Sequence, residues 1–307
     1  MLRLDALTLK QLRALVAVQK AGSLTAAAET LSLTTPAIHS QIKGLESALA
    51  TPMLTRSPNH AGLVPTAQGR LVISAAERID AIMSQMAAEL VALSQGKTGR
   101  VTLGVVSTAK YFAPGLVRVL NQRCPDIDIS LVVGNRATII ASLERGALGL
   151  AIMGRPPRPP EVVAVPLGPN PHGIVVPPDH PLAGHAEVDP DLLLRETFIA
   201  REPGSGTRIL TQHYLDGISD GRQIRMIEMD SNETIKQAVI AGLGIAMLSL
   251  HTVDEELRSG RLRLLQGRGL PIMRHWYLVH LASAPVDAAA AALAEQIVAL
   301  NGTFLPH

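Results

Sequence analysis

The sequence predicts a multidomain α and α/β protein, in which a small helical domain, one long helix and a larger α/β domain follow one another. Three observations predict this fold class. Two short amphipathic helices are indicated within residues 22–49, an unbroken apolar stripe runs through residues 66–94, and short apolar runs alternate with helical segments beyond residue 100. At 307 residues, 47% of them hydrophobic, the chain can form two or more well-buried domains.

The first domain, residues 1–65, is organised around the pair of short helices. Ser23 can cap the first helix and Thr34 or Thr35 the second, where Pro36 is tolerated because no internal donor is lost in the first turn. Apolar residues three or four positions apart form the buried side of the second helix, namely Ile38, Ile42, Leu45 and Leu49.

The other side of the second helix carries small or hydrogen-bonding groups and one cation, including Pro36, His39, Ser40 and Lys43. Such a surface can enter the major groove of duplex DNA, but it is equally typical of any helical hairpin with a solvated side, so the spacing leaves both interpretations open. Residues 1–65 hold six Lys and Arg against three Asp and Glu, an excess larger than the +2 of the whole chain.

Residues 51–63 contain the turn formers of a short hairpin, which would be a wing beside the helices. Arg56 and His60 could there contact phosphate or the minor groove. The alternative is an exposed loop that carries one cation.

Thr66 opens a helix that we expect to reach about Ser94. Its apolar residues are separated by three or four positions throughout, namely Leu71, Ala75, Ile79, Ile82, Met86, Leu90 and Leu93. At ~1.5 Å per residue the helix would extend roughly 40 Å, too long for its own small domain. We expect residues 66–95 to pair with a second copy, while packing along the larger domain of the same chain is the alternative.

Beyond a short polar hinge, residues 96–307 alternate strands with helices. The predicted strands are 101–106, 127–133, 148–153, 162–167, 173–176, 197–200, 224–229, 245–248, 261–265 and 276–280. This alternation indicates parallel sheets covered on both faces. The chain would cross near 168 and return near 270, giving lobe I at about 100–168 and 271–307, lobe II at about 169–270, and a cleft between them.

Three predicted strand-to-helix junctions, at 107–110, 202–208 and 230–234, carry hydroxyl groups, glycines and nearby cations. Ligands of α/β sheets bind beyond the carboxyl ends of strands, where helix N-termini offer free N–H groups. Each junction alone is typical of a helix cap, but together they suit an anionic, phosphorylated ligand. The candidate ligand-binding residues are Ser107, Thr108, Lys110, Asn135, Arg136, Arg155, Glu202, Ser205, Gly206, Thr207, Arg208, Asn232, Glu233 and Thr234.

Several kinds of chemistry have no support in the sequence. The run around Ser205 lacks the flanking glycines of a nucleophile elbow, no P-loop is present, and the single Cys124 forms neither a disulfide nor a zinc site. Lone histidines such as His172 are interpreted as surface or satisfied core groups. Aromatic residues, at 2%, are too few for a base-stacking platform. We expect no metal, no cofactor and no enzymatic activity.

No signal peptide and no apolar span near ~20 residues is evident, so we expect a cytoplasmic protein without a membrane partner.

Residues 8–69 resemble the winged helix-turn-helix of LysR-type transcriptional regulators, through Gly22-Ser23, Ala26-Ala27-Ala28, Pro36-Ala37-Ile38, Gln41-Ile42, Leu45-Glu46, Thr66 and Gly69. The resemblance implies a dimerising linker helix at 66–95 and a periplasmic-binding-protein-like effector domain at 96–307. The DNA-binding residues would be Lys10, Ser23, Thr34, Thr35, Pro36, His39, Ser40, Lys43 and Arg56.

Within the α/β part, residues 105–114, 134–136, 151–157, 201–208 and 231–239 resemble the CbbR subgroup of that family. The resemblance implies control of a carbon-fixation operon and an effector such as a sugar phosphate or NADPH. It also implies double-stranded DNA, a second copy in a homodimer or homotetramer, and RNA polymerase as partners. The alternative from another class is a solute-binding or enzymatic α/β protein with an accessory helical domain.

Overall fold

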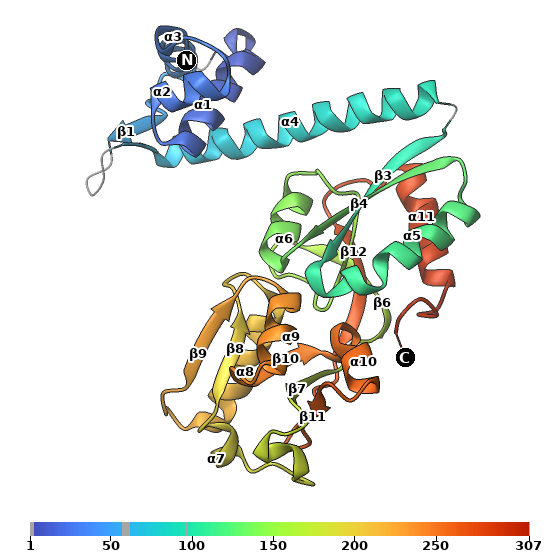
Figure 1. Cartoon of the computed structure of the whole chain (residues 1–307). Helices are drawn as coiled ribbons and strands as arrows, with labels where there is room; N and C mark the ends of the chain where they lie inside the picture. The colour runs from blue at the N-terminus through green and yellow to red at the C-terminus, as the bar shows by residue number, and fades with distance from the viewer. Residues whose placement is uncertain (1–2, 57–61, 96, 307) are drawn as a thin grey trace. The chain divides into compact units, whose positions relative to one another are not determined.

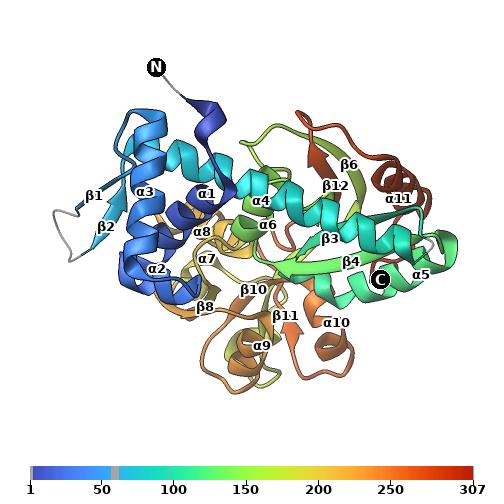
Figure 2. The ribbon, with the colours of Figure 1, turned by 90° about the horizontal axis from the view of Figure 1, so that it is seen from above.

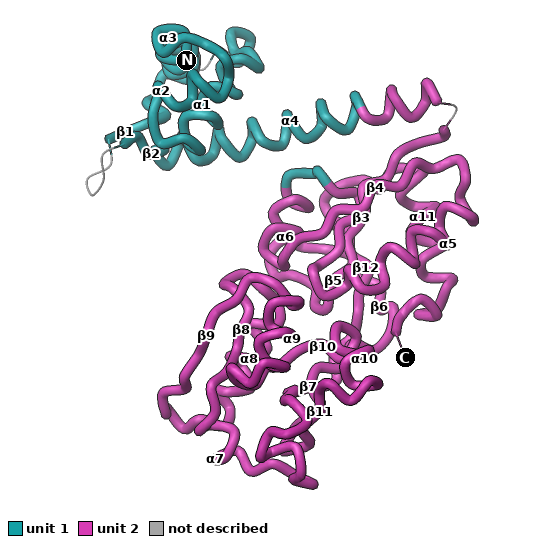
Figure 3. The backbone as a smooth tube through the Cα atoms, in the orientation of Figure 1, with its two compact units in different colours: residues 1–87, 145–147 teal, residues 88–144, 148–307 magenta. Residues whose placement is uncertain are grey.

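The structure is a computed structural model, and it describes residues 3–56, 62–95 and 97–306 (Figure 1). It divides into two compact units, 1–87 with 145–147, and 88–144 with 148–307 (Figure 3). The boundary between the units falls within the long helix α4 (Ala67–Ser94).

The first unit is a three-helix head with a two-stranded hairpin. Its elements are η1 (Leu4–Ala6), α1 (Leu9–Ala21), α2 (Leu24–Thr30), α3 (Thr35–Leu49), β1 (Leu54–Arg56) and β2 (Leu63–Pro65), followed by most of α4. The predicted caps are confirmed, since Ser23 Oγ accepts from the N–H of Ala26 and Thr34 Oγ1 from that of Ala37. The side chains of Leu15, Ile38 and Leu45 are fully buried where the three helices meet.

Helix α4 begins after Thr66, whose Oγ1 accepts from the N–H of Gly69 at 2.9 Å. Arg13 Nε of α1 lies 2.8 Å from Asp80 Oδ1, which ties α4 to the head. The predicted apolar stripe is largely uncovered, with Leu71 74% exposed and Leu90 60% exposed. Such a face has the character of an unpartnered packing surface.

The second unit contains two lobes. Lobe I has one five-stranded sheet in the order β4-β3-β5-β12-β6. Its strands are β3 (Gly99–Val106), β4 (Ile127–Gly134), β5 (Leu150–Met153), β6 (Val162–Pro169) and β12 (His275–Leu281), and its helices are η2 (Ser107–Tyr111), α5 (Ala113–Arg123), α6 (Arg136–Glu144) and α11 (Ala288–Ala299). Figures 1 and 2 show α5 and α11 on one face of the sheet and α6 on the other.

Lobe II has two smaller sheets, in the orders β10-β7-β11 and β8-β9. Its strands are β7 (His172–Val176), β8 (Thr197–Arg201), β9 (Arg225–Met229), β10 (Ala246–Ser249) and β11 (Arg263–Leu264). Its helices are η3 (Pro181–Gly184), α7 (Pro190–Leu193), α8 (Gly206–Ser219), α9 (Asn232–Ile240) and α10 (Leu250–Arg258), of which η3, α7 and α10 were not predicted from the sequence. Apolar cores around Phe198 and around Val239 hold the lobe together.

The expectation of parallel sheets is wrong for much of this unit. β12 runs antiparallel to both β5 and β6, and β7 runs antiparallel to β10 and β11. The physical reason is the double crossing between the lobes, because β6 leaves lobe I next to the strand β12 that returns to it, and neighbours of opposite direction pair antiparallel. The two-lobed α/β fold class itself is confirmed.

The two crossing segments are hydrogen-bonded to each other. The N–H of Asn170 donates to the carbonyl of Arg274 at 2.7 Å, and His172 and Ile272 exchange two further bonds. Next to this crossing, Trp276 is fully buried, its ring 5.1 Å from that of Phe112, and its Nε1 donates to His251 Nδ1 at 3.0 Å. The crossing is thus a packed hinge.

Candidate functional site

The polar side of α3 is exposed to solvent, as the 3.6-residue spacing of its apolar and polar residues predicts. We call this surface the α3 face, and its exposed residues are Thr34, Pro36, His39, Ser40 and Lys43. Thr35 is half-buried at its edge, and Ser23 is exposed at the cap of α2. Lys10 of α1 and Arg56 of β1 are exposed on the same unit. His60 lies outside the described residues.

The single cation of the α3 face is paired within its own helix. Lys43 Nζ lies 2.8 Å from Glu46 Oε2, while Glu46 Oε1 accepts from the N–H of Met53 at 2.9 Å. Burial raises the pKa of Glu46, but the hydrogen bonds from Lys43 and Met53 outweigh it and hold that pKa below its ordinary value. The carboxylate therefore partly offsets the charge that Lys43 brings to the face.

A cavity of about 510 Å³ lies between the two lobes of the second unit. Lobe I contributes residues that follow β3, β4 and β5, and lobe II contributes the start of α8, while both crossing segments line the floor. The hydroxyl-bearing residues in its wall are Ser107, Thr108, Ser205 and Thr207, and the apolar ones are Val106, Pro156, Ile209 and Leu210. We call this space the arginine cavity, for the reason that follows.

Four arginines line the cavity, namely Arg136, Arg155, Arg158 and Arg274, and no carboxylate does among the described residues. Burial lowers the pKa of Arg136 and that of Arg274, and the positive charge of Arg155 lowers both further. Arg136 and Arg274 nevertheless remain charged, because arginine is effectively always protonated in proteins. The repulsion among these cations is relieved by an anion, so the cavity is suited to a ligand that carries several negative charges.

Arg136 also stabilises the neighbouring part of the cavity wall through hydrogen bonds to its backbone. At the start of α6 its Nη1 donates to the carbonyl of Arg155 and its Nη2 to that of Pro156, the latter at 3.2 Å. These bonds fix the loop after β5, which carries Arg155 and Arg158 into the cavity. Both of those side chains are exposed to solvent there.

The opposite wall is the start of α8. Ser205 is its N-cap residue, is 3% exposed and makes no capping hydrogen bond with its side chain. Gly206 and Thr207 follow in the first turn, and all three line the cavity. Gly204 just before them has a φ of +89°, a conformation that favours glycine. Unpaired N–H groups at a helix start complement an anion held by the arginines.

His172 lines the cavity from the hinge. Its Nδ1 lies 2.9 Å from the carbonyl oxygen of Asn170, which can only accept, so Nδ1 carries the proton in the neutral ring. Burial lowers the pKa of His172 to about 4, and the positive charge of Arg274 adds to the effect. The sequence interpretation of this histidine as a satisfied core group is therefore incomplete, because the ring is also part of the cavity wall.

Half of the predicted ligand residues line the cavity, namely Ser107, Thr108, Arg136, Arg155, Ser205, Gly206 and Thr207. The structure places the others in hydrogen-bonded contacts outside its wall, namely Lys110, Asn135, Glu202, Arg208, Asn232, Glu233 and Thr234. Two of these contacts join one lobe to the other, namely Lys110 with Glu233 and Asn135 with Glu202.

One interlobe contact is centred on Glu233 at the start of α9. Its two carboxylate oxygens accept from Lys110 Nζ and from the hydroxyl of Tyr111, each at 2.5 Å. Burial raises the pKa of Glu233, but these hydrogen bonds outweigh it and lower that pKa. Conversely, burial and the Glu233 carboxylate raise the pKa of Tyr111. Thr234 shares the cap of α9 with Ser231, their hydroxyl oxygens 2.8 Å apart.

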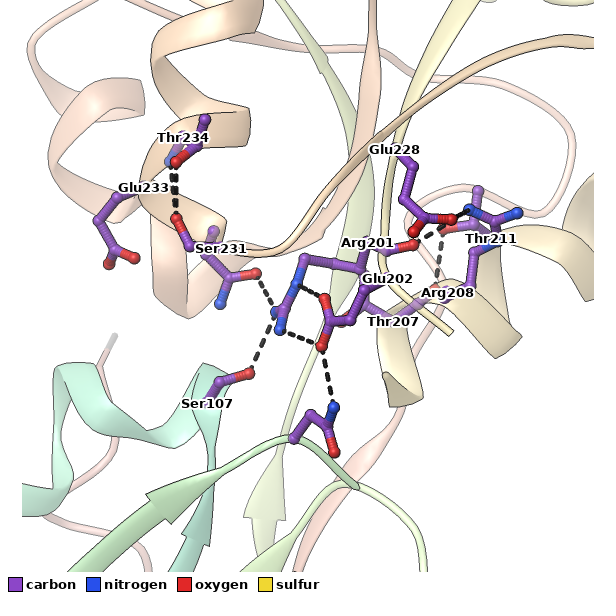
Figure 4. Close-up of polar contacts among 12 residues, drawn as sticks. Ser107, Arg201, Glu202, Thr207, Arg208, Thr211, Glu228, Ser231, Glu233 and Thr234 are labelled. Carbon is purple, nitrogen blue, oxygen red and sulfur yellow. Dashed lines mark hydrogen bonds and ion pairs between the residues drawn. The ribbon is translucent and has the colours of Figure 1, made fainter. Parts of the chain in front are cut away.

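The second interlobe contact is centred on Arg201, at the end of β8 (Figure 4). Its guanidinium binds the carboxylate of Glu202 through two N–H groups and donates through Nη1 to Asn232 Oδ1 and to Ser107 Oγ. Asn135 Nδ2 of lobe I donates to Glu202 Oε1 at 3.2 Å. Figure 4 also shows Arg208 turned away from Ser107. Its Nη1 donates to the Arg201 carbonyl and lies 3.7 Å from Glu228 Oε2.

Sequence reasoning missed several residues of the cavity wall. Arg158 follows the predicted strand at 148–153 and the Arg155-Pro156-Pro157 run, so the strand-end rule could have found it. Arg274 precedes the returning strand, and its position depends on the crossing that the sequence predicts only approximately. Asn170 and His213 carry no local signal of a ligand site.

Two searches of the described residues gave negative results. No group of three or more His, Cys, Asp or Glu side chains there is placed to hold a metal ion. No helix in the same residues combines the length and apolarity that crossing a bilayer requires.

A winged helix-turn-helix head joined to a two-lobed domain with an anion-suited cavity defines a ligand-responsive DNA-binding regulator. Comparison with known families agrees. Residues 9–70 match the bacterial regulatory helix-turn-helix protein, lysR family, and residues 94–301 match the LysR substrate binding domain. The chain belongs to the LysR family.

Individual relatives extend over the whole chain or one unit of it. The HTH-type transcriptional regulator CbbR of Cereibacter sphaeroides is 57% identical over 306 residues, covering 100% of this chain and 99% of that protein. The regulatory domain of CcmR from Synechocystis PCC6803, solved in complex with 2-PG, is 34% identical with a TM-score of 0.62 and covers 66% of this chain and 98% of that one. Full-length CbnR, solved with its target DNA, is 19% identical with a TM-score of 0.68, covering 96% and 100%, and supports the fold alone.

These relatives are transcriptional regulators, so the prediction of a regulator rather than an enzyme is confirmed. The alternative of a solute-binding or enzymatic protein with an accessory helical domain is set aside for the same reason.

Proposed function

We propose that this chain regulates carbon-fixation genes by binding a phosphorylated metabolite in the arginine cavity and duplex DNA through the α3 face. The observation that carries the proposal is a 510 Å³ cavity lined by four arginines and, among the described residues, by no carboxylate. The link to carbon fixation rests on the 57% identity to CbbR along the full chain.

Within the phosphorylated metabolites, a sugar phosphate or a similarly small phosphorylated acid fits better than NADPH. The cavity wall holds arginines, hydroxyl groups, aliphatic side chains and the imidazoles of His172 and His213, but no Phe, Tyr or Trp among the described residues. An adenine or nicotinamide ring would therefore have no large aromatic side chain to stack on. The 2-PG held by the CcmR regulatory domain, a phosphorylated metabolite, belongs to the chemistry we propose.

We assign residues 1–65 to DNA binding. Lys10, Lys43 and Arg56 would contact phosphates or groove edges. The base-facing set would comprise Thr34, Thr35, Pro36, His39 and Ser40, with Ser23 at the start of α2 beside them. Exposure of most of this set on one surface supports the assignment, because a helix that reads bases must leave one side free.

We assign residues 66–95 to dimerisation and 96–307 to effector binding. Exposed apolar side chains recur along α4 at the period that a helix pair needs, which supports a homodimer. A homotetramer, contact with RNA polymerase and a cytoplasmic location are further parts of the proposal, and membership of the LysR family supports them. Effector binding would change the balance between arrangements of the two lobes, and α4 would transmit that change.

A mobility-shift assay with DNA flanking the protein's own gene tests both halves of the proposal. We expect a shift that changes in pattern or affinity when ribulose bisphosphate or 2-PG is added. An Arg155→Ala, Arg274→Ala double variant should shift DNA as before yet ignore the metabolite. Failure to bind any duplex would refute the DNA half, and an unchanged metabolite response in the double variant would refute the cavity half.

A further inference from the structure

Arg201 is buried at 3% exposure and is not part of the wall of the arginine cavity. Its Nε and Nη2 donate to the Glu202 carboxylate at 2.7 and 3.0 Å, and its Nη1 donates to Asn232 Oδ1 at 2.7 Å. Three bonds to lobe II therefore hold the guanidinium in one orientation. A fourth bond, from the same Nη1, reaches across to Ser107 Oγ of lobe I at 3.1 Å.

The direction of that fourth bond fixes the role of the serine. A guanidinium has donors and no acceptor, so Ser107 Oγ must accept from Arg201. The proton of the serine hydroxyl is then free to be donated elsewhere, and the described residues offer it no hydrogen-bonded acceptor. Since Ser107 lines the cavity, the available acceptor is an oxygen of whatever the cavity holds.

We infer that Arg201 is a positioning residue for the ligand, because from lobe II it sets the Ser107 hydroxyl of lobe I as a hydrogen-bond donor into the cavity. The inference rests on the proposed function and deepens it. It also defines the chemistry of the ligand atom at this point, which is a hydrogen-bond acceptor such as a phosphoryl or carboxylate oxygen.

The arrangement makes ligand binding depend on the contact between lobes. Separation of the lobes breaks the bond from Arg201 to Ser107, and the serine hydroxyl is then free to turn toward other acceptors. A ligand oxygen that accepts from Ser107 therefore binds better when the lobes are in contact and favours that state. Arg201 affects affinity without touching the ligand.

A double-mutant cycle on the full-length protein tests this, with calorimetric titration of 2-PG and ribulose bisphosphate as probes. The variants are Ser107→Ala, Arg201→Lys and the two combined. Ser107→Ala should lower affinity about tenfold, the loss of one charge-assisted bond. Arg201→Lys keeps the charge but loses the planar fork, so we expect a similar loss in the wild-type background and almost none in the Ser107→Ala background.

A merely structural role for Arg201 predicts something different, namely an equal loss of affinity in both backgrounds. That result, or no loss in either background, overturns the inference. Ser107→Thr, which keeps the hydroxyl, should restore most of the affinity lost in Ser107→Ala. If Arg201→Lys does not fold, Glu202→Gln in the same cycle removes the carboxylate that orients Arg201 and should show the same dependence on Ser107.

Two controls separate this inference from the proposed function. Arg222→Lys alters an exposed ion pair with Asp191 in the same lobe and should leave the affinity for both probes unchanged. Arg274→Met removes a cavity cation. Suppose that Arg274→Met lowers the affinity while the effects of Ser107→Ala and Arg201→Lys simply add. In that case the cavity assignment holds and only the role of Arg201 is wrong. If neither probe binds, or Arg274→Met has no effect, the cavity assignment fails and the inference fails with it.

Discussion

The α3 face and the arginine cavity differ in how they carry positive charge. The α3 face has one cation, Lys43, which is 64% exposed at its side chain and paired with Glu46. The cavity gathers four arginines from three separate segments, with no carboxylate in the described wall. Exposed, paired charges contribute little individually, whereas partly buried, uncompensated ones such as Arg136 and Arg274 contribute much. We therefore expect DNA affinity to depend on the number of contacts and copies, and ligand affinity on single side chains.

The largest change in operator affinity should come from disrupting the proposed dimerisation through α4. Leu90→Glu places a carboxylate on the exposed apolar stripe of α4, where burial against a second copy would cost several kcal/mol. We expect a monomer in analytical ultracentrifugation and a loss of operator affinity of about 100-fold, because two linked heads bind far better than one. Ser84→Glu, which falls off the stripe, should change neither.

A dimer that survives Leu90→Glu unchanged would mean that α4 is not the pairing surface, and the two copies would then have to pair through another surface.

The next effect concerns a single cavity cation. Arg274→Met keeps the bulk of the side chain but removes its charge, so we expect about 30-fold weaker binding of ribulose bisphosphate or 2-PG, or about 2 kcal/mol. Binding to operator DNA without ligand should be unaffected. Calorimetry measures the affinity for the metabolite, and a mobility-shift assay measures the affinity for operator DNA. A parallel loss of both affinities would contradict the assignment of Arg274 to the ligand alone.

A pH effect distinguishes the cavity from the α3 face. In the folded chain the pKa of His172 is lowered to about 4 from 6.5, so the protein favours the neutral ring. The contribution of the neutral His172 ring to the free energy of unfolding is fully present above pH 6.5 and is lost as the pH falls toward 4. Between pH 7 and 5 the loss should be about 2 kcal/mol in denaturant unfolding.

The matched variants for this pH effect are His172→Gln, which should flatten the dependence, and His185→Gln at an exposed site, which should not. Equal slopes in the two variants would show that His172 is not the group responsible.

The smallest effect is expected at the α3 face. Lys43→Ala should weaken operator binding only two- to threefold, since Glu46 already offsets part of the charge. The slope of log affinity against log salt should fall by about 0.9 for each phosphate contact removed. Lys20→Ala, an exposed lysine outside the proposed interface, serves as the control. An unchanged slope in Lys43→Ala would remove Lys43 from the DNA contacts.

The difference between the two surfaces also explains what could be predicted from sequence. The α3 face comes from one continuous segment, so the 3.6-residue period and the caps at Ser23 and Thr34 were sufficient to predict which side of the helix is exposed, although they did not distinguish a DNA interface from a solvated side. The same local signals predicted most strands and helices of the α/β part. They failed for sheet direction, because the antiparallel pairing of β12 follows from a crossing between segments about 100 residues apart.

The cavity was predicted only in part, because its wall depends on contacts between distant residues. Ser107, Ser205 and Thr207 were found from strand ends and helix starts, which are local features. Lys110 and Glu233 were placed at the ligand for the same reason, but across the lobes they bond to each other instead. Nothing in the local sequence of Arg274 indicates a ligand, since its place in the wall is set by the hinge.

The position of Trp276 has a practical consequence. It is the single tryptophan of the chain, fully buried two residues after Arg274 and hydrogen-bonded to His251 of the other lobe. Indole emission responds to the polarity of its surroundings and to a neighbouring imidazole. Trp276 therefore serves as an intrinsic fluorescence probe of the crossing between the lobes. A change in its emission on adding a metabolite would report lobe movement without any attached label.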